Sequence, residues 1–481
     1  MSGNPERPDA EDSLEDAELE QTDFLPEDEP VESAPVQYQR CLIAVVGRPN
    51  VGKSTLFNRL IGERLAIVHD APGVTRDRNY ADAVIGGRSV TVVDTGGFDP
   101  TTDDPMGQGI ARHVMAAIAE ADLVLCVLDG VNPPTQADAD AIKLLRRADK
   151  PVLYCANKVD SQKHEAEITE LYRLGVDRLY PLSALHGRGL GELELAMRSG
   201  LPAPVVLETG ATDDLEVPRV ALLGRPNAGK SSLFNRLSGS ERSLVDDRPG
   251  TTRDAVDSEV EVAGQRYWLI DTAGIRKKAK VQEEVESASV MRSIKAAGRA
   301  DIVILMCDAS EGIGDQEQRL LGLCAERGRG IVVGLNKSDL LTAAQRKAAV
   351  QQAEEKLGFA RWAKVMLLSA KNGNGVEALM KQARRTHREL HRRIPTAELN
   401  RFFESVLERR PPPTAGGKAP RLYYVTQAQT NPPLFVAMSN APEVINEGYR
   451  RFVMNQLRKT FGFDSVPIKI AFRKRSRRGD S

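Results

Sequence analysis

The chain contains two nearly identical stretches, and this duplication constrains its fold more than any other feature. GRPNVGKSTLFNRL begins at Gly47, and GRPNAGKSSLFNRL begins 177 residues later at Gly224. The hexamers PGVTRD and VVDTGG of the first half recur as PGTTRD and LIDTAG in the second half, at the same offset. A constant offset over three blocks indicates a duplicated domain, and this period is too long for a solenoid repeat.

Two shorter blocks extend the duplication. NKVD at Asn157 recurs as NKSD at Asn336, and LSAL at Leu182 recurs as LSAK at Leu368. Short apolar runs alternate with helical patterns between the blocks. The runs are CLIAVVG, SVTVVD, DLVLCVLD and PVLYCANK in the first copy and RVALLG, YWLID, DIVILMCD and GIVVGLNK in the second. This alternation predicts two α/β domains, each with a mostly parallel sheet and helices on both faces.

Gly86–Gly87 in the first copy and Ala263–Gly264 in the second precede the strand that ends in an aspartate. Pairs of such residues between apolar runs favour two-residue hairpin turns. We therefore expect one antiparallel edge strand on each otherwise parallel sheet.

The composition of the 481 residues, 41% hydrophobic and 28% charged, is typical of a soluble globular protein. No apolar run is long enough to span a membrane, and the acidic N-terminus does not resemble a secretory signal. We therefore expect a cytoplasmic protein with reduced, buried thiols at its five cysteines, which are Cys41, Cys126, Cys155, Cys307 and Cys324.

Charge is strongly segregated along the chain. Residues 1–38 carry thirteen acidic residues and one arginine, which predicts a disordered tail. From Arg388 to the end there are eighteen lysines and arginines against eight acidic residues. The acidic tail either solubilises the protein or competes with RNA for the basic end; the sequence leaves both interpretations open.

These patterns divide the chain into six segments. The basic end carries a small module with a predicted helix at Thr396–Arg409, two strands, a second helix near Glu447–Phe461 and a last strand, VPIKIAF. The predicted segments are the tail 1–38, the first domain 39–203, a linker 204–217, the second domain 218–387, the C-terminal module 388–472 and a basic tail 473–481.

The repeated stretch has the pattern G-x4-G-K-S between a predicted strand and a predicted helix, which is the context of a phosphate-binding loop. Glycines allow backbone N–H groups to approach phosphate oxygens. Lys53 and Lys230 are expected to reach the β- and γ-phosphates, and Ser54 and Ser231 are expected to bind Mg²⁺.

The other blocks supply the remaining parts of a nucleotide switch. Asp94 and Asp271 end apolar strands, where a carboxylate can hold a magnesium-bound water. Gly97 and Gly274 leave a backbone N–H free for the γ-phosphate. Thr75 and Thr252 lie in polar loops that can close over Mg²⁺ when the γ-phosphate is present, and they complete the expected magnesium residues.

The last two blocks predict selection of guanine. An aspartate at the end of NKxD, which is Asp160 or Asp339, can accept hydrogen bonds from the guanine N1–H and its 2-amino group. Adenine lacks this pair of donors. Ser183–Ala184 and Ser369–Ala370 would offer a backbone N–H near the guanine O6.

Five motifs in the same order, twice, followed by a small basic module, resemble the Der family of bacterial ribosome-assembly GTPases, also called EngA. The resemblance covers residues 39–475. It implies tandem P-loop GTPase domains, a KH-like C-terminal domain, GTP hydrolysis, and a role in maturation of the large ribosomal subunit through its RNA. No membrane or DNA partner is implied, and we expect a monomer.

Both copies depart from the best-known GTPases. Phe98 and Ile275 follow the D-x-x-G motif, where a glutamine would orient water, so slow hydrolysis is expected. Related GTPases use an asparagine at the position of Asn50 and Asn227 to hold potassium, which can neutralise developing charge; the alternative is that these side chains only brace the loop. We expect Arg48 and Arg225 to be exposed, although both can meet phosphate.

The segments after the D-x-x-G motifs differ in charge, FDPTTDDP in the first copy and IRKKAK in the second, which indicates two different roles. In the C-terminal module we find no G-x-x-G clamp between helices, so RNA binding is expected to rest on phosphate contacts, including those of RKRSRR at Arg473–Arg478. A GTP-regulated scaffold with one weakly hydrolytic site is the alternative, and a nucleotide kinase is disfavoured by NKxD and D-x-x-G.

The residues expected to act in catalysis are Lys53, Thr75, Gly97, Lys230, Thr252 and Gly274. The residues expected to bind nucleotide are Gly47, Arg48, Pro49, Asn50, Val51, Gly52, Lys53, Ser54, Thr55, Asp94, Thr95, Gly96, Gly97, Asn157, Lys158, Asp160, Ser183 and Ala184 in the first copy, and Gly224, Arg225, Pro226, Asn227, Ala228, Gly229, Lys230, Ser231, Ser232, Asp271, Thr272, Ala273, Gly274, Asn336, Lys337, Asp339, Ser369 and Ala370 in the second.

Overall fold

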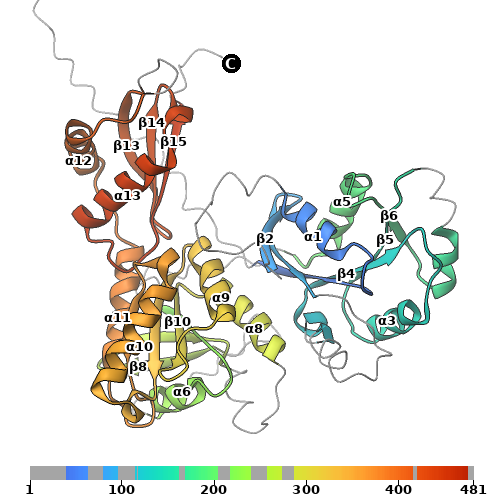
Figure 1. The fold of residues 1–481 in the computed structure, drawn as a ribbon, viewed down its shortest axis with the longest axis horizontal. Coiled ribbons are helices and arrows are strands. Elements are labelled where there is room, and N and C mark those ends of the chain that lie inside the picture. Colours follow the sequence, from blue (N-terminus) through green and yellow to red (C-terminus); the bar gives the residue numbers. More distant parts are fainter. Residues whose placement is uncertain are drawn as a thin grey trace, which may run out of the picture. The chain divides into compact units, whose positions relative to one another are not determined.

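The computed structural model describes residues 40–62, 80–95, 114–115, 117–161, 168–203, 217–239, 257–272, 286–414 and 420–474. Three sheets are formed by these residues (Figure 1). Two are six-stranded and belong to the two copies, and the third is three-stranded and belongs to the C-terminal module. The predicted α/β class is therefore confirmed.

The first sheet has the order β2-β3-β1-β4-β5-β6. Its strands are β1 Cys41–Val46, β2 Tyr80–Ile85, β3 Arg88–Asp94, β4 Leu123–Asp129, β5 Val152–Asn157 and β6 Leu179–Pro181. Its helices are α1 Lys53–Ile61, α3 Gln136–Arg146, α5 Leu190–Gly200 and the 3₁₀-helix η2 Ile168–Leu174. Ile43 of β1 packs into the same cluster as α1 and α5, whereas Ala44 packs with α3, so helices cover both faces.

The second sheet repeats this arrangement in the order β12-β11-β10-β7-β9-β8. Its strands are β7 Arg219–Leu223, β8 Ser258–Val262, β9 Gln265–Ile270, β10 Ile302–Asp308, β11 Gly330–Asn336 and β12 Lys364–Leu367. Its helices are α6 Lys230–Ser238, α8 Glu286–Arg299, α9 Asp315–Glu326, α10 Ala343–Lys356 and α11 Val376–Leu390, with short 3₁₀-helices η4 Ser338–Leu340 and η5 Gly358–Ala360. Alternate residues of β10 again point to opposite faces, Ile304 with α6 and α11 and Leu305 with α8 and α9.

Each large sheet has one antiparallel edge strand, β2 against β3 and β8 against β9. The connecting turns have positive φ at both central residues, 54° and 79° at Gly86 and Gly87, and 50° and 74° at Ala263 and Gly264. This is the geometry of the two-residue turn that matches strand twist. The predicted hairpins are confirmed, and Ala263 adopts the left-handed conformation despite its Cβ.

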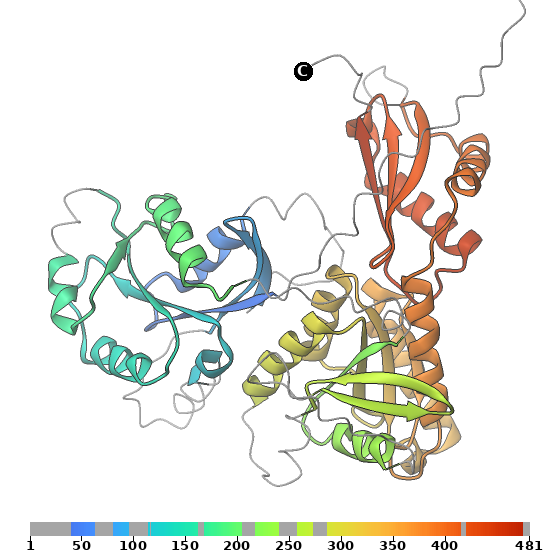
Figure 2. The ribbon, with the colours of Figure 1, turned by 180° about the vertical axis from the view of Figure 1, so that it is seen from behind.

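The C-terminal module follows the predicted order α-β-β-α-β. It consists of α12 Thr396–Arg409, β13 Leu422–Gln429, β14 Leu434–Ser439, η6 Pro442–Val444, α13 Glu447–Phe461 and β15 Lys469–Lys474. Figures 1 and 2 show α13 along one face of this sheet. Val425, Phe435 and Ala437 on that face pack into a core with residues of both helices.

On the other face of the module, Tyr424, Met438 and Arg473 are directly paired across the three strands. Paired residues on neighbouring strands point to the same face. A bulge between Leu422 and Tyr424 leaves both Tyr423 and Tyr424 about two-fifths exposed. This face therefore presents aromatic, thioether and cationic side chains together.

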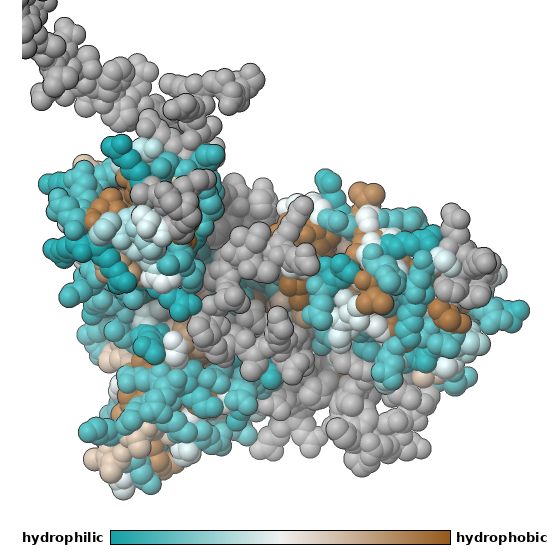
Figure 3. Space-filling view, turned by 45° about the horizontal axis from the view of Figure 1, so that its top comes forward, coloured by the Kyte–Doolittle hydropathy of each residue, from teal (hydrophilic) through white to brown (hydrophobic). Residues whose placement is uncertain are grey.

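Within the described residues, no helix is both long enough and apolar enough to cross a membrane. Hydrophilic residues cover most of the described surface in the view of Figure 3, with small separate hydrophobic patches. All five cysteines are buried free thiols, as predicted.

Candidate nucleotide-binding sites

The two phosphate-loop stretches connect β1 to α1 and β7 to α6, at the carboxyl ends of their strands. Gly52 and Gly229 immediately precede the helices with φ of 93° and 97°. A Cβ on Gly52 would lie 2.2 Å from Nδ2 of Asn157, and one on Gly229 would lie 2.0 Å from Nδ2 of Asn336. Only glycine therefore allows the loop to approach the NKxD asparagine this closely.

The phosphate-loop lysines are held inside their loops. Nζ of Lys53 donates to the Arg48 carbonyl at 2.7 Å, and burial lowers the pKa of this lysine. Nζ of Lys230 donates to the carbonyls of Gly224 and Arg225 at 2.5 and 2.6 Å. Each ammonium is thus placed where a phosphate oxygen can replace a carbonyl as its acceptor.

The first copy brings two predicted magnesium residues together, since Oγ of Ser54 donates to Oδ2 of Asp94 at 2.6 Å. A hydroxyl beside a carboxylate at the foot of a phosphate loop suits Mg²⁺, which prefers oxygen ligands and retains several waters. In the second copy, burial raises the pKa of Asp271 to about 6, and its backbone is left-handed with φ of 57°. Eight residues named in the sequence analysis lie outside the described residues: Thr75, Gly96, Gly97, Phe98, Thr252, Ala273, Gly274 and Ile275.

The NKxD asparagines connect the phosphate loop to the loop that carries Ser183–Ala184 or Ser369–Ala370, which we call the SA loop. Nδ2 of Asn157 donates to the Val51 carbonyl at 2.8 Å, and its Oδ1 accepts from the Ala184 N–H at 2.9 Å. Asn336 bridges Ala228 and Ala370 in the same way, at 2.9 and 2.8 Å. Of the two residues in each block predicted to offer an N–H to guanine O6, the alanine thus donates to an asparagine in both copies.

The second copy has a cavity of 540 Å³ between the phosphate loop, the NKSD block and the LSAK block. Asp339, the predicted guanine acceptor, is exposed at this cavity, as is the corresponding Asp160 of the first copy at its own loop. The cavity is lined by Pro226, Asn227, Gly229, Lys230, Ser231, Ser232, Asn336, Lys337, Asp339, Leu340, Ser369, Ala370 and Lys371. Eleven of the residues predicted for the second site line this cavity, whereas Asp271 and Thr272 do not.

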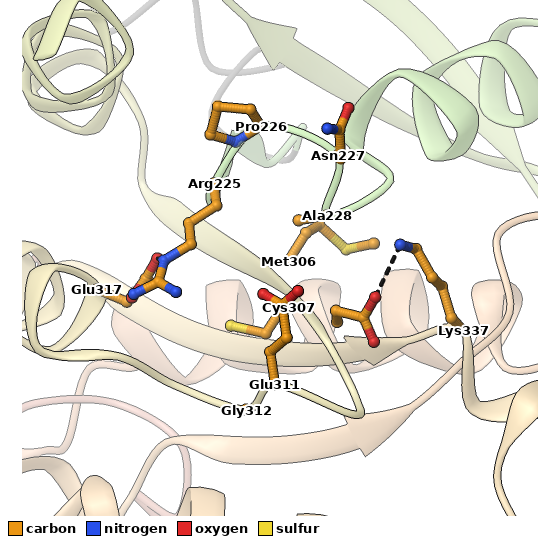
Figure 4. Close-up of a pocket in the computed structure, with 11 residues that line it drawn as sticks. Arg225, Pro226, Asn227, Ala228, Met306, Cys307, Glu311, Gly312, Glu317 and Lys337 are labelled. Carbon is orange, nitrogen blue, oxygen red and sulfur yellow. Dashed lines mark ion pairs between the residues drawn. The ribbon is translucent and has the colours of Figure 1, made fainter. Parts of the chain in front are cut away.

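A smaller cavity of 40 Å³ lies on another side of the same phosphate loop (Figure 4). There Arg225 points to Glu317, with Nε 2.6 Å from Oε1, and Lys337 pairs with Asp308 at 2.7 Å. Glu317 is buried and also accepts the Gly314 N–H at the start of α9. This acid therefore joins a helix N-terminus to the phosphate loop.

The first copy contains the equivalent pairs. Nε of Arg48 lies 3.2 Å from Oδ2 of the buried Asp138, and Nζ of Lys158 lies 2.7 Å from Oδ2 of Asp129. Although burial acts in the opposite direction, hydrogen bonds from Lys158 and Asn132 lower the pKa of Asp129 to about 2. The expectation that both phosphate-loop arginines are freely exposed is wrong, because each is half-buried against a buried carboxylate.

Asn50 and Asn227 have left-handed backbones, with φ of 65° and 64°. Asparagine tolerates this conformation better than most residues. Both are exposed, and Asn227 lines both cavities of the second copy. An exposed amide oxygen at the rim of the phosphate loop is a suitable potassium ligand.

Two mostly parallel sheets, each with a phosphate loop, an aspartate at or directly after the end of a strand, and an NKxD block, define a tandem P-loop GTPase. The family model "50S ribosome-binding GTPase" matches residues 42–158 and 219–337, and "KH-domain-like of EngA bacterial GTPase enzymes, C-terminal" matches residues 393–473. "GTPase Der" of Syntrophotalea carbinolica is 42% identical over 91% of this chain and 99% of its own length. "GTPase Der" of Salinispora arenicola is 45% identical over 91% of this chain and 93% of its own length. The chain belongs to the GTPase Der family: it binds guanine nucleotides and hydrolyses GTP.

Proposed function

We propose that this GTPase is a two-site switch in the assembly of the large ribosomal subunit, acting in the cytoplasm as a monomer that docks on ribosomal RNA. The observation that carries the proposal is the occurrence of two similar nucleotide sites in a chain whose C-terminal module is strongly basic. The description of the matching family model as ribosome-binding supports it. The parts that move in this switch would be the three domains predicted from the sequence, which are residues 39–203, 218–387 and 388–472.

In this proposal each site binds GTP along the path that the cavity follows in the second copy. Lys53 and Lys230 bind the β- and γ-phosphates, while Asp160 and Asp339 accept hydrogen bonds from the guanine edge. Ser54, Asp94, Ser231 and Asp271, with Thr75 and Thr252, would hold Mg²⁺, which when bound neutralises charge on the phosphates. The backbone N–H groups of Gly97 and Gly274 would meet the γ-phosphate.

Catalysis would use potassium instead of a water-orienting glutamine. Asn50 and Asn227 provide the amide oxygens, at the edge of each phosphate loop, and a fixed cation there can stabilise negative charge as it develops. Arg48 and Arg225 would hold the loop through their buried acids and would not touch phosphate.

RNA docking would use the face of the C-terminal sheet that carries Tyr424 and Arg473, both of which are exposed. Tyr424 offers a ring on which an unpaired base can stack, and Arg473 on the same cross-strand row can contact a phosphate. If about five side chains engage phosphates, the log–log slope of affinity against salt is roughly −3 to −5.

The test is binding of full-length protein to large-subunit RNA over a salt series. Deleting residues 473–481 should flatten the slope, and deleting residues 1–38 should tighten binding at low salt. Tyr424→Leu should lower the affinity for RNA without changing the slope. Arg473→Gln should lower the affinity and also make the slope shallower. Identical affinities and slopes for all five proteins would refute the RNA docking.

The nucleotide switch is tested by footprinting the protein on precursors of the large subunit with GDP and with a non-hydrolysable GTP analogue. Lys53→Met and Lys230→Met separate the two sites. The switch predicts that each variant loses a different part of the nucleotide-dependent footprint. If the footprint depends on nucleotide binding at one site, and that site hardly hydrolyses GTP, the result would instead support the GTP-regulated scaffold.

A further inference from the structure

Both copies place an arginine of the helix that follows the phosphate loop against the SA loop. Nε of Arg59 donates to the Ala184 carbonyl at 3.1 Å, and its Nη2 donates to the Leu185 carbonyl at 2.5 Å. Arg236 repeats this in the second copy, where Nε donates to the Ala370 carbonyl at 2.7 Å and Nη2 donates to the carbonyl of the next residue. Two consecutive carbonyls are therefore held by one guanidinium in each copy.

The loop leaves room for this guanidinium. Gly187 and Gly373 have φ of 77° and 87°. Their N–H groups donate to the backbone carbonyls of Ser183 and Ser369, each at 2.8 Å. A Cβ on Gly373 would lie 2.9 Å from Nη1 of Arg236. The glycine thus turns the chain and clears the arginine.

The held carbonyls determine where the neighbouring N–H groups point. The Ala184 carbonyl and the Leu185 N–H belong to one peptide group, which is trans, so the N–H points away from Arg59. The Ala184 N–H donates to Asn157. Among the described residues the Leu185 N–H has no acceptor, and the same holds for the N–H of Lys371 in the second copy. Lys371 lines the 540 Å³ cavity.

We propose that Arg59 and Arg236 are positioning residues for guanine recognition, which hold the N–H groups of Leu185 and Lys371 toward the O6 carbonyl of the bound base. The inference rests on the proposed nucleotide orientation in these sites. A hydrogen bond to the carbonyl also polarises the peptide and strengthens its N–H as a donor. The fork of arginine holds both carbonyls at once, which the single ammonium of lysine cannot do in one geometry.

The arrangement also joins the two ends of the site. Arg59 and Lys53 lie on the same helix, α1, and Arg236 and Lys230 lie on α6. The helix that starts at the phosphates therefore also fixes the loop at the base.

The test is calorimetric titration of full-length protein with three diphosphates: GDP, 6-thio-GDP, which replaces O6 with sulfur, and IDP, which keeps O6 but lacks the 2-amino group. Arg236→Met should lower the affinity for GDP and for IDP at one of the two sites by about fivefold to tenfold. The affinity for 6-thio-GDP at that site should fall much less. Arg59→Met should do the same at the other site. Arg236→Lys should recover only part of the loss, and Asn235→Ala, an exposed neighbour on α6, should bind as the wild type does.

An equal loss for GDP and 6-thio-GDP, or no loss for either arginine variant, would overturn the positioning role. If the wild type itself does not prefer GDP to 6-thio-GDP, the proposed orientation of the base fails instead. The two failures are therefore distinguishable.

Discussion

The two G domains share their backbone supports and differ in the side chains around them. Both have the glycine before the helix, the bridging asparagine, and the helix arginine that donates to the SA loop. The first copy pairs Ser54 with Asp94, whereas in the second copy partial burial raises the pKa of Asp271 to about 6. Duplication thus preserved the frame that orients a nucleotide and allowed its immediate surroundings to diverge.

A second difference lies at the base end, where Leu185 occupies the position of Lys371. Leu185 is 67% exposed. Lys371 instead lines the nucleotide cavity. The same backbone geometry therefore carries an apolar side chain in one site and a cation in the other, which favours different nucleotide affinities.

The largest effect is expected from the NKxD aspartates, because they test whether each copy is an independent guanine site. Asp339→Asn should weaken GTP binding at the second site by about 2–4 kcal/mol, because a donor replaces the acceptor of two hydrogen bonds. Binding of xanthosine nucleotides at that site should improve. Asp160→Asn should do the same at the first site only, as measured by two-site titration. A loss at both sites from either variant would mean that the copies are not independent.

A pH effect should separate the stability of the two domains. Burial lowers the pKa of His387 to about 4, even though Asp301 lies 3.8 Å away and acts in the opposite direction; His391, Arg384 and Arg388 lower it further. The unfolded chain binds this proton near pH 6.5, so folding stability falls as pH drops from about 6.5 to 4, by up to about 3 kcal/mol.

The measurement is urea unfolding followed by tryptophan fluorescence, because both tryptophans, Trp268 and Trp362, lie in the second copy. His387→Gln should flatten the pH dependence of that signal. The fall in stability between pH 6.5 and 4 should then shrink relative to wild type. An unchanged pH profile in the variant would assign the effect to other groups.

The bridging asparagines should stabilise their own domains. Asn336→Ala leaves the Ala370 N–H and the Ala228 carbonyl without their partner inside the protein and should cost about 2 kcal/mol of unfolding free energy. Asn157→Ala should cost a similar amount in the first domain. Only Asn336→Ala should shift the unfolding midpoint detected by tryptophan fluorescence. Both variants should shift the unfolding transition detected by circular dichroism. Equal tryptophan shifts would show that the two domains unfold together.

The smallest effect is expected from the monovalent cation. GTP hydrolysis should be several times faster in potassium than in sodium at matched ionic strength, because a fixed cation near the phosphates stabilises developing charge. Asn50→Ala and Asn227→Ala should each remove part of the difference, and the double variant should remove it. Equal rates in both salts for the wild type would exclude potassium from catalysis.

Most of the fold could be predicted because its signals are local. The apolar runs became β1, β3, β4, β5, β7, β9, β10 and β11, and the small-residue pairs became hairpin turns. The strands β6 and β12 were missed, since three or four residues are too few for a periodic pattern. The residues that we propose to bind nucleotide were likewise predicted from a local signal, the spacing within each motif.

What could not be predicted depends on contacts between distant residues. Arg236 and Ala370 are 134 positions apart, and Asn157 and Val51 are 106 apart. Asp138 and Glu317 have no motif that distinguishes them from other acids at a helix start. Only the folded sheet brings them to the phosphate-loop arginines, which is why those arginines were expected at the surface.

The buried cysteines have a practical consequence for experiments on this protein. Burial raises the pKa of Cys155, Cys307 and Cys324 to about 12, and it also raises the pKa of Cys41 and Cys126. Because thiolates are the species that react with maleimides, the native thiols should resist labelling near neutral pH. A single cysteine added on an exposed helix position can therefore carry a fluorophore or cross-linker in the otherwise unaltered chain.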